Sequence, residues 1–126
     1  MSAPKANSLL VTDRIQDSFY YLSWEEVFSL LADYDIEATV VYGVPKGGMI
    51  VTAFLEHGFA THDPVEADFI LDDIIDSGKT VAYYNRTHPG KPFCALLDKT
   101  VLPRVWDPVW FVFPWEAAKK ILNQNK

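Results

Sequence analysis

The chain has 126 residues, of which 49% are hydrophobic and 22% are charged, and its formal net charge is −6 at pH 7. This length supports one hydrophobic core, and the composition is typical of a globular domain rather than a disordered chain. The negative charge argues against a general nucleic-acid-binding surface, because phosphate backbones attract basic patches. A small phosphorylated ligand held by local backbone N–H groups and a metal ion stays compatible with it.

The start of the chain divides into a polar segment and a first helix. Residues 1–18 are polar without clear periodicity, which predicts an N-terminal arm that precedes one domain at 19–126. Residues 23–34 are predicted to be a helix, since Ser23 and Glu26 have the spacing of a capping box and apolar residues then recur on one face.

Further along, apolar strand-like runs alternate with helical patterns. Alternation of this kind predicts an α/β fold, here a single domain with a mostly parallel sheet of four to five strands flanked by helices. We expect strands at 38–44, 68–73, 92–99 and 107–113, and helices at 49–58, 79–88 and 114–124.

Two glycine-bearing segments follow predicted strands directly. They are "GVPKGG" at 43–48 and "DDIIDSGKT" at 72–80. In open parallel sheets, ligands bind beyond the carboxyl ends of the strands. Both segments begin at such an end, so we expect a binding site there.

Two structural interpretations of 72–80 account for only part of the segment. The "SGKT" end is similar to a phosphate-binding P-loop, but the first glycine of that motif falls on Asp73, whose carboxylate would face the phosphates. Alternatively, Asp76 or Ser77 is the N-cap of the next helix. A cap explains one carboxylate, but it does not explain why Asp72 and Asp73 lie together at the end of an apolar strand.

A ribose-phosphate site explains the whole segment. The backbone N–H groups of 76–80, with the hydroxyls of Ser77 and Thr80, could converge on one phosphate. Asp72 and Asp73 would then lie beside the ribose and accept hydrogen bonds from its hydroxyls, directly or through Mg²⁺.

The segment "FILDDIIDSGKT" (69–80) resembles the phosphoribosyl pyrophosphate (PRPP) binding signature of the type I phosphoribosyltransferases: a run of apolar residues, two acids, two apolar residues, then D-[ST]-G-x-T. "YGVPKGG" (42–48) is similar to the pyrophosphate loop of that family. "CALLDK" (94–99) and "VWFVFPWE" (109–116) resemble the purine-binding end of its xanthine, guanine and hypoxanthine members. The resemblance covers about residues 20–120.

The resemblance implies a role for each matching residue. Asp72 and Asp73 would hold the ribose hydroxyls and help to organise magnesium. Asp76 would also be catalytic, handling a proton near nitrogen 7 of the purine. The predicted 5′-phosphate-binding residues are Asp76, Ser77, Gly78, Lys79 and Thr80.

Pyrophosphate binding is assigned by resemblance to Lys46 and Gly47, next to a cis peptide bond expected between Pro45 and Lys46. Without the signature at 69–80, this segment would be interpreted as a glycine-rich turn with a solvated lysine.

The purine-binding residues implied by the resemblance are Lys99, Trp110 and Phe111. Lys99 would donate to the 6-oxo group, and a donor-only cation favours oxopurines over adenine. Trp110 would stack on the base and the Phe111 backbone would meet its edge, while the neighbouring aromatics are expected to be core. Glu116 would lie near the purine 2-position or the metal, or is a first-turn acid of a helix. Taken alone, Lys99 after a strand would be a surface lysine.

The long flexible loop that usually closes over PRPP in this family is missing or reduced to a stub at 59–67. Three hypotheses stay open. The first is a magnesium-dependent 6-oxopurine phosphoribosyltransferase of purine salvage. The second is a non-catalytic, regulatory protein that binds PRPP or a purine nucleotide. The third is a PRPP-using enzyme for another base or amine, against which the segments at 94–99 and 109–116 count.

Location and partners are expected from simpler features. No apolar stretch approaches the roughly 20 residues that span a bilayer, and the start lacks the pattern of a secretory signal. The single cysteine, Cys94, cannot form an internal disulfide. We therefore expect a cytoplasmic protein that does not bind membranes. The resemblance also implies a homodimer or a higher homo-oligomer.

Overall fold

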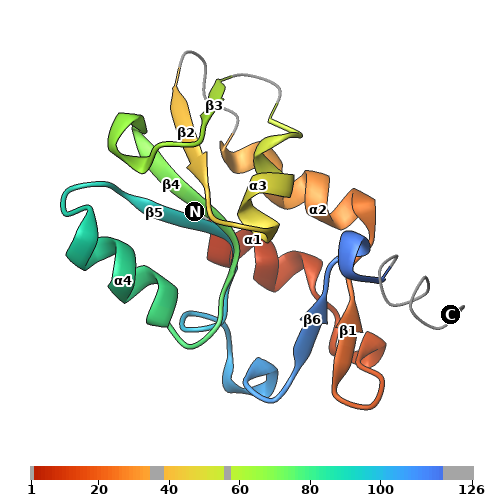
Figure 1. The fold of residues 1–126 in the computed structure, drawn as a ribbon. Helices are drawn as coiled ribbons and strands as arrows, with labels where there is room; N and C mark the ends of the chain where they lie inside the picture. The colour runs from red at the N-terminus through yellow and green to blue at the C-terminus, as the bar shows by residue number, and fades with distance from the viewer. Residues whose placement is uncertain (1, 35–38, 56–57, 118–126) are drawn as a thin grey trace, which may run out of the picture.

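The computed structural model describes residues 2–34, 39–55 and 58–117. Four parallel strands form one sheet in the order β3-β2-β4-β5, and two further parallel strands, β1 and β6, pair beside it (Figure 1). The strands are β1 Phe19–Tyr21, β2 Val40–Gly43, β3 Phe59–Thr61, β4 Phe69–Ile75, β5 Phe93–Asp98 and β6 Trp110–Val112. The helices are α1 Ser2–Leu9, α2 Trp24–Leu31, α3 Gly47–Thr52 and α4 Lys79–Thr87, with 3₁₀ turns η1 Thr12–Arg14, η2 Ala32–Tyr34, η3 Pro64–Glu66 and η4 Arg104–Trp106.

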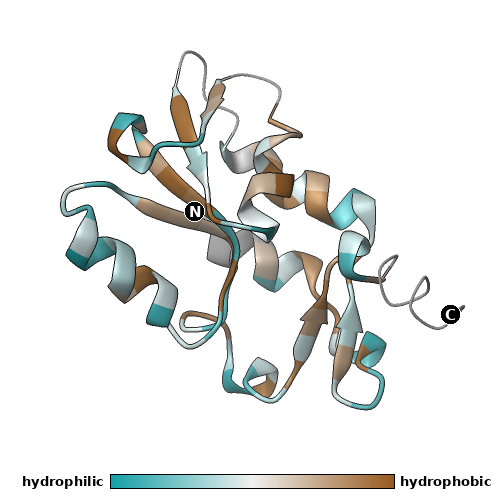
Figure 2. Cartoon of the chain, in the orientation of Figure 1, coloured by the Kyte–Doolittle hydropathy of each residue, from teal (hydrophilic) through white to brown (hydrophobic). Residues whose placement is uncertain are grey.

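The helices cover both faces of the four-stranded sheet. Helices α1, α2 and α3 lie on one side and α4 lies on the other (Figure 1). The core fills the first side, where Val27 and Leu30 of α2 and Val51 of α3 pack with Leu71 and Leu97 of the sheet. Helix α4 contributes no buried residue, and Figure 2 shows it mostly pale or teal beside the brown strands. The predicted α/β fold with a parallel four-stranded sheet is confirmed. Within the part of the chain that is described, no helix is both long and apolar enough to span a membrane.

The predicted capping box starts α2 as expected. The Ser23 hydroxyl accepts the Glu26 N–H at 3.1 Å, and the Glu26 carboxylate accepts the Ser23 N–H at 2.9 Å. The ends of other helices and strands differ from the predicted ends by a few residues. The helix predicted at 49–58 is α3, which starts at Gly47 and has ended by Ala53. The strand predicted at 68–73 runs on to Ile75, because β5 pairs with it as far as Asp98.

The strand predicted at 107–113 does not join the main sheet. Only Trp110–Val112 is extended, and it pairs in parallel with β1, with Trp110 opposite Phe19. Strands β1 and β3 were not predicted, since each has three residues and no alternation long enough to detect. Residues 114–117 are helical, as expected, and the rest of the helix predicted at 114–124 lies outside the described residues.

The segment expected to be an arm, 1–18, packs onto the domain in the structure. Its residues Ser2–Leu9 form α1, and Ala6 and Leu10 are buried in the core. The mean hydropathy of α1 is low. Among the residues of 6–18, whose burial the structure describes, Ala6 and Leu10 alone are buried, which is too few to give a periodic signal. Tertiary contact with β5 therefore orders a stretch whose local sequence indicates little.

Residue Tyr20 joins this segment to α2. Its ring is fully buried, and its hydroxyl donates to Glu26 at 3.2 Å and accepts from Arg14 at 3.0 Å. Arg14 also donates to Glu26 at 2.7 Å. Burial raises the pKa of Glu26, but hydrogen bonds from Ser23 and Arg14 outweigh it, so the pKa lies below its usual value.

We expect Glu26→Gln to lower the free energy of unfolding near neutral pH by about 1 kcal/mol, since half-exposed Arg14 loses its charged partner. A carboxylate with a lowered folded-state pKa contributes stability above its unfolded pKa and loses it as the pH falls through the folded pKa. The difference between wild type and variant should therefore shrink below about pH 4. Urea unfolding from pH 7 to pH 3 measures it. Glu25→Gln, on the exposed side of α2, is the matched control, and an equal effect there would contradict the prediction.

Candidate active site

The loop after β2 lies tightly against the end of β4. It contains the expected cis peptide bond between Pro45 and Lys46. A Cβ atom on Gly48 would overlap the backbone carbonyl of Leu71, and one on Gly47 would overlap the Asp73 carboxylate. Only glycine at 47 and 48 lets the loop approach this closely. The Lys46 side chain is exposed at the edge of the same cavity as Asp73.

The two acids at the end of β4 are adjacent, and Asp72 is buried while Asp73 is half-buried. Asp72 is only 8% exposed, and its carboxylate accepts the Asp73 N–H at 2.8 Å. Asp73 accepts the Ile74 N–H at 2.8 Å. Burial, the charge of Asp73 and a hydrogen bond with it raise the pKa of Asp72 to about 7. Burial also raises the pKa of Asp73. The pair therefore favours a cation or hydrogen-bond donors from a ligand.

The turn from β4 to α4 is open on the side of this pair. Gly78 has a φ of 87°, in the left-handed region, and is the N-cap of α4 without a side-chain cap. The Lys79 N–H approaches the Ser77 hydroxyl at 3.4 Å. The interpretation of Asp76 or Ser77 as the N-cap is therefore wrong. The start of α4 instead faces the cavity beside Asp73.

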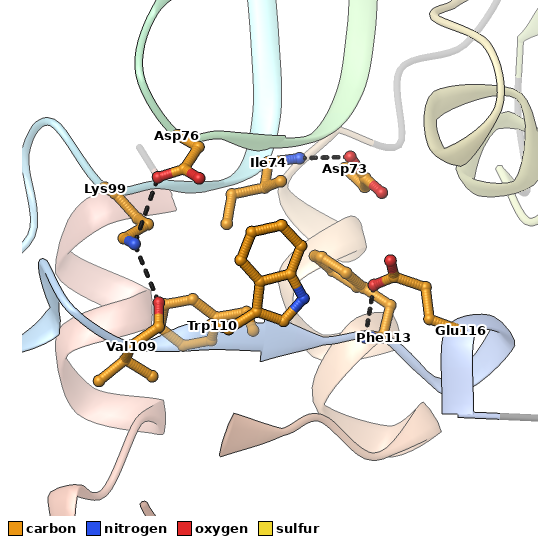
Figure 3. Close-up of a pocket in the computed structure, with 9 residues that line it drawn as sticks. Asp73, Ile74, Asp76, Lys99, Val109, Trp110, Phe113 and Glu116 are labelled. Carbon is orange, nitrogen blue, oxygen red and sulfur yellow. Dashed lines mark hydrogen bonds and ion pairs between the residues drawn. The ribbon is translucent and has the colours of Figure 1, made fainter. Parts of the chain in front are cut away.

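Lys99, just after β5, is held from three sides. Its ammonium donates to the backbone carbonyl of Asp107 at 2.9 Å. It also donates to the Val109 carbonyl at 2.9 Å and forms an ion pair with Asp76 at 3.2 Å (Figure 3). The side chain is 10% exposed, so the interpretation as a surface lysine is wrong. The two carbonyls belong to the segment that leads into β6, and Lys99 thus attaches that segment to the end of β5.

Trp110 was predicted to face the ligand, and the neighbouring aromatic residues were predicted to be core. Trp110 is 56% exposed and points toward the cavity between Asp73 and Lys99 (Figure 3). Phe111 is buried against Tyr20 and Trp106. The Glu116 carboxylate accepts the Phe113 N–H at 3.1 Å, which supports its interpretation as an acid in the first turn of the helix that starts at residue 114. Glu116 also lines the cavity, so both of its predicted roles stay open.

These residues surround two adjoining cavities. The larger, of about 360 Å³, is lined by 44–47, by Asp72 and Asp73, by 76–81 and by Trp110. This volume is within the range of small-molecule sites. The smaller, of about 60 Å³, contains Lys99, Phe111 and Glu116. Four residues line both cavities: Asp73, Ile74, Asp76 and Trp110. Every residue predicted for the site thus lies on one cavity or the other, while its chemical role stays a prediction.

Sequence reasoning missed the residues that act through their backbone. The carbonyls of Asp107 and Val109 hold Lys99, but any residue type supplies a carbonyl, so no sequence signal could have identified them. Ile74 lies between the two cavities and belongs to the apolar pair inside the signature at 69–80. The sequence showed that Ile74 belongs to this pair, but it did not indicate that Ile74 lines both cavities.

The donor set at the end of β4 fits a hard divalent cation. Mg²⁺ binds through one or two carboxylates together with phosphate oxygens of a substrate, and the buried Asp72 and the half-buried Asp73 supply two carboxylates on the larger cavity. No group of three or more histidine, cysteine or acidic side chains able to hold a metal occurs among the described residues. Asp72 and Asp73 would hold Mg²⁺ together with phosphate oxygens of a substrate.

No family model and no curated protein match this chain. Among solved structures, it is similar to the crystal structure of a purine phosphoribosyltransferase from Pyrococcus horikoshii. The two sequences are 21% identical, the TM-score is 0.49, and the match covers 79% of this chain and 94% of the other.

Proposed function

We propose that this chain is a magnesium-dependent phosphoribosyltransferase that joins the 5-phosphoribosyl group of PRPP to a 6-oxopurine and releases pyrophosphate, in purine salvage. The observation that carries the proposal is the meeting of the two cavities at Asp73, Asp76 and Trp110. Glycine loops suited to phosphates line one cavity. A buried lysine and an exposed tryptophan, suited to a purine, line the other.

The reaction exchanges one bond for another at the ribose. The bond from ribose carbon 1 to the pyrophosphate oxygen breaks and its electron pair leaves with pyrophosphate, while a purine ring nitrogen donates the pair that forms the new bond. Asp76 accepts the proton that the purine loses. Asp72 and Asp73 would orient the ribose hydroxyls, and 76–80 would hold the 5′-phosphate. When bound, Mg²⁺ neutralises charge on the pyrophosphate.

Product formation tests the proposal. The purified chain is incubated with Mg²⁺ and PRPP and, separately, with hypoxanthine, guanine, xanthine or adenine, and nucleotides are separated by chromatography. We expect nucleotide from at least one oxopurine and none from adenine, because the Lys99 ammonium is a donor only. No nucleotide from any base would overturn the proposal.

Trp110→Ala should weaken purine binding by roughly 5- to 150-fold, since stacking of a base on an aromatic ring is worth about 1–3 kcal/mol. The melting temperature should hardly change, because the Trp110 side chain is more than half exposed. Calorimetric titration with GMP measures the loss. Trp24→Ala removes another exposed tryptophan, on α2, and should leave GMP affinity unchanged. Equal affinity in both variants would contradict the stacking role.

One observation favours a second candidate function, a regulatory protein that binds PRPP or a purine nucleotide without transfer. In the stretch 59–67, where a lid was expected to be short or missing, β3 pairs with β2 at the sheet edge and η3 follows. No described residue of 53–67 lines either cavity. Lids exclude water during group transfer. If PRPP or GMP raises the melting temperature while no base yields nucleotide, this second function replaces the first.

A further inference from the structure

The Lys99 ammonium already has partners within the chain. A protonated lysine has three N–H donors. In the structure two of them bind the carbonyls of Asp107 and Val109. The ammonium also forms an ion pair with the Asp76 carboxylate at 3.2 Å (Figure 3). A 6-oxo group that approaches Lys99 competes with these partners.

The Asp76 carboxylate is the acceptor that leaves most easily. Its contact with Lys99 is the longest of the three, at 3.2 Å, and its side chain is 53% exposed, so water can solvate it once released. The two carbonyls are fixed in the backbone on the approach to β6, and Val109 is buried. Losing them would detach this segment from β5. An ion pair with one exposed member is worth only about 0.2–1 kcal/mol.

The separated pair would present a donor beside an acceptor. Lys99 then donates and the Asp76 carboxylate accepts, and both line the smaller cavity next to Trp110. The edge of an oxopurine that carries O6 and a protonated nitrogen 7 offers the complementary acceptor and donor. A base without an oxygen at carbon 6 cannot replace Asp76 on Lys99.

We propose that the Lys99–Asp76 ion pair closes the purine end of the site in the free protein, and that a 6-oxopurine opens it by replacing the Asp76 carboxylate on the Lys99 ammonium. This inference rests on the proposed function and adds to it that recognition of the base and release of the catalytic carboxylate are one event. Asp76 in the free protein competes with the substrate.

Two measurable consequences follow. Asp76→Asn removes the competing charge but keeps an oxygen acceptor, so hypoxanthine should bind the variant about two- to fivefold more tightly than wild type. Turnover in the same variant should fall by about 100-fold or more, because its proton acceptor is lost. A lower KM for the base with a lower kcat is not expected of a merely structural residue.

The closing experiment titrates hypoxanthine into the full chain by calorimetry in about 0.01 M and about 1 M salt, between which the Debye length falls from about 30 Å to about 3 Å. Salt weakens the ion pair, so the affinity of this uncharged base should rise about two- to fivefold in wild type and stay constant in Asp76→Asn. Unsubstituted purine, which lacks the 6-oxo group, should show no salt effect with either protein.

Asp98→Asn is the matched control. It makes the same charge change next to Lys99 in the chain, but the Asp98 carboxylate accepts the Thr100 N–H and lines neither cavity, so the variant should behave as wild type. Equal salt dependence in wild type and Asp76→Asn, weaker binding by the variant, or no binding of hypoxanthine to either protein would overturn the inference. If the pair opens as described but no nucleotide forms from PRPP, only the proposed transfer is lost.

Discussion

Replacing Asp72 by asparagine should raise the melting temperature of the free protein and reduce nucleotide formation by at least about 100-fold. The Asp72 carboxylate is 8% exposed and next to the Asp73 carboxylate, and burial together with this neighbour raises its pKa to about 7. The folded protein therefore carries a charge that its surroundings disfavour. Asparagine has the same shape and keeps the oxygen that accepts the Asp73 N–H. It removes the repulsion, but it also removes a ligand for Mg²⁺ and the ribose hydroxyls.

The prediction requires that the melting temperature rises while nucleotide formation falls. Thermal unfolding without ligand and the nucleotide assay measure the two quantities on the same preparation. Asp68→Asn is the control: Asp68 is exposed just before the same strand, and it accepts the Val40 N–H at 2.8 Å. Asparagine there should change neither quantity much. A less stable Asp72→Asn protein would show that Asp72 is structural, and full activity would remove it from the site.

The part of the site that sequence predicts best is the part encoded in one continuous segment. Residues 69–80 combine an apolar strand, two acids and a glycine turn, and each step is local: the strand ends, the chain turns, a helix begins. Local steps of this kind follow from residue types and their spacing. The structure accordingly brings Asp72, Asp73 and 76–80 together around one cavity.

Contacts between distant segments were not visible in the sequence. The pairing of β1 with β6 joins Tyr20 to Phe111 across some ninety residues of chain, and neither three-residue strand has a pattern of its own. The contacts of the Lys99 ammonium were not visible in the sequence either, because two of its partners are backbone carbonyls, which any residue type supplies. The resemblance assigned Lys99 to the base. The structure shows that the Lys99 ammonium already contacts two carbonyls and the Asp76 carboxylate. The proposed competition between Asp76 and the base for Lys99 follows from these contacts.

A second variant with a large effect is Gly47→Ala. A methyl group at 47 would overlap the Asp73 carboxylate, which is held in place by the Ile74 N–H. Either Asp73 or the loop must shift. A displacement of about 1 Å in a positioning group can cost about 100-fold in rate, so kcat/KM for PRPP should fall by about that factor. Stability should change little, since alanine also restricts the unfolded chain.

Gly90→Ala should give the reverse result. Gly90 has a φ of 87°, where a side chain is strained, but a Cβ atom there would meet nothing within 4 Å, and the residue does not line either cavity. Its replacement should cost about 1–2 kcal/mol of stability and leave transfer intact in the folded protein. Together the two variants separate the two reasons for a glycine: close approach at 47 and backbone conformation at 90. If Gly47→Ala kept wild-type transfer, the loop at 43–48 would not position Asp73 or pyrophosphate, and the phosphate side of the proposed site would have to be reassigned.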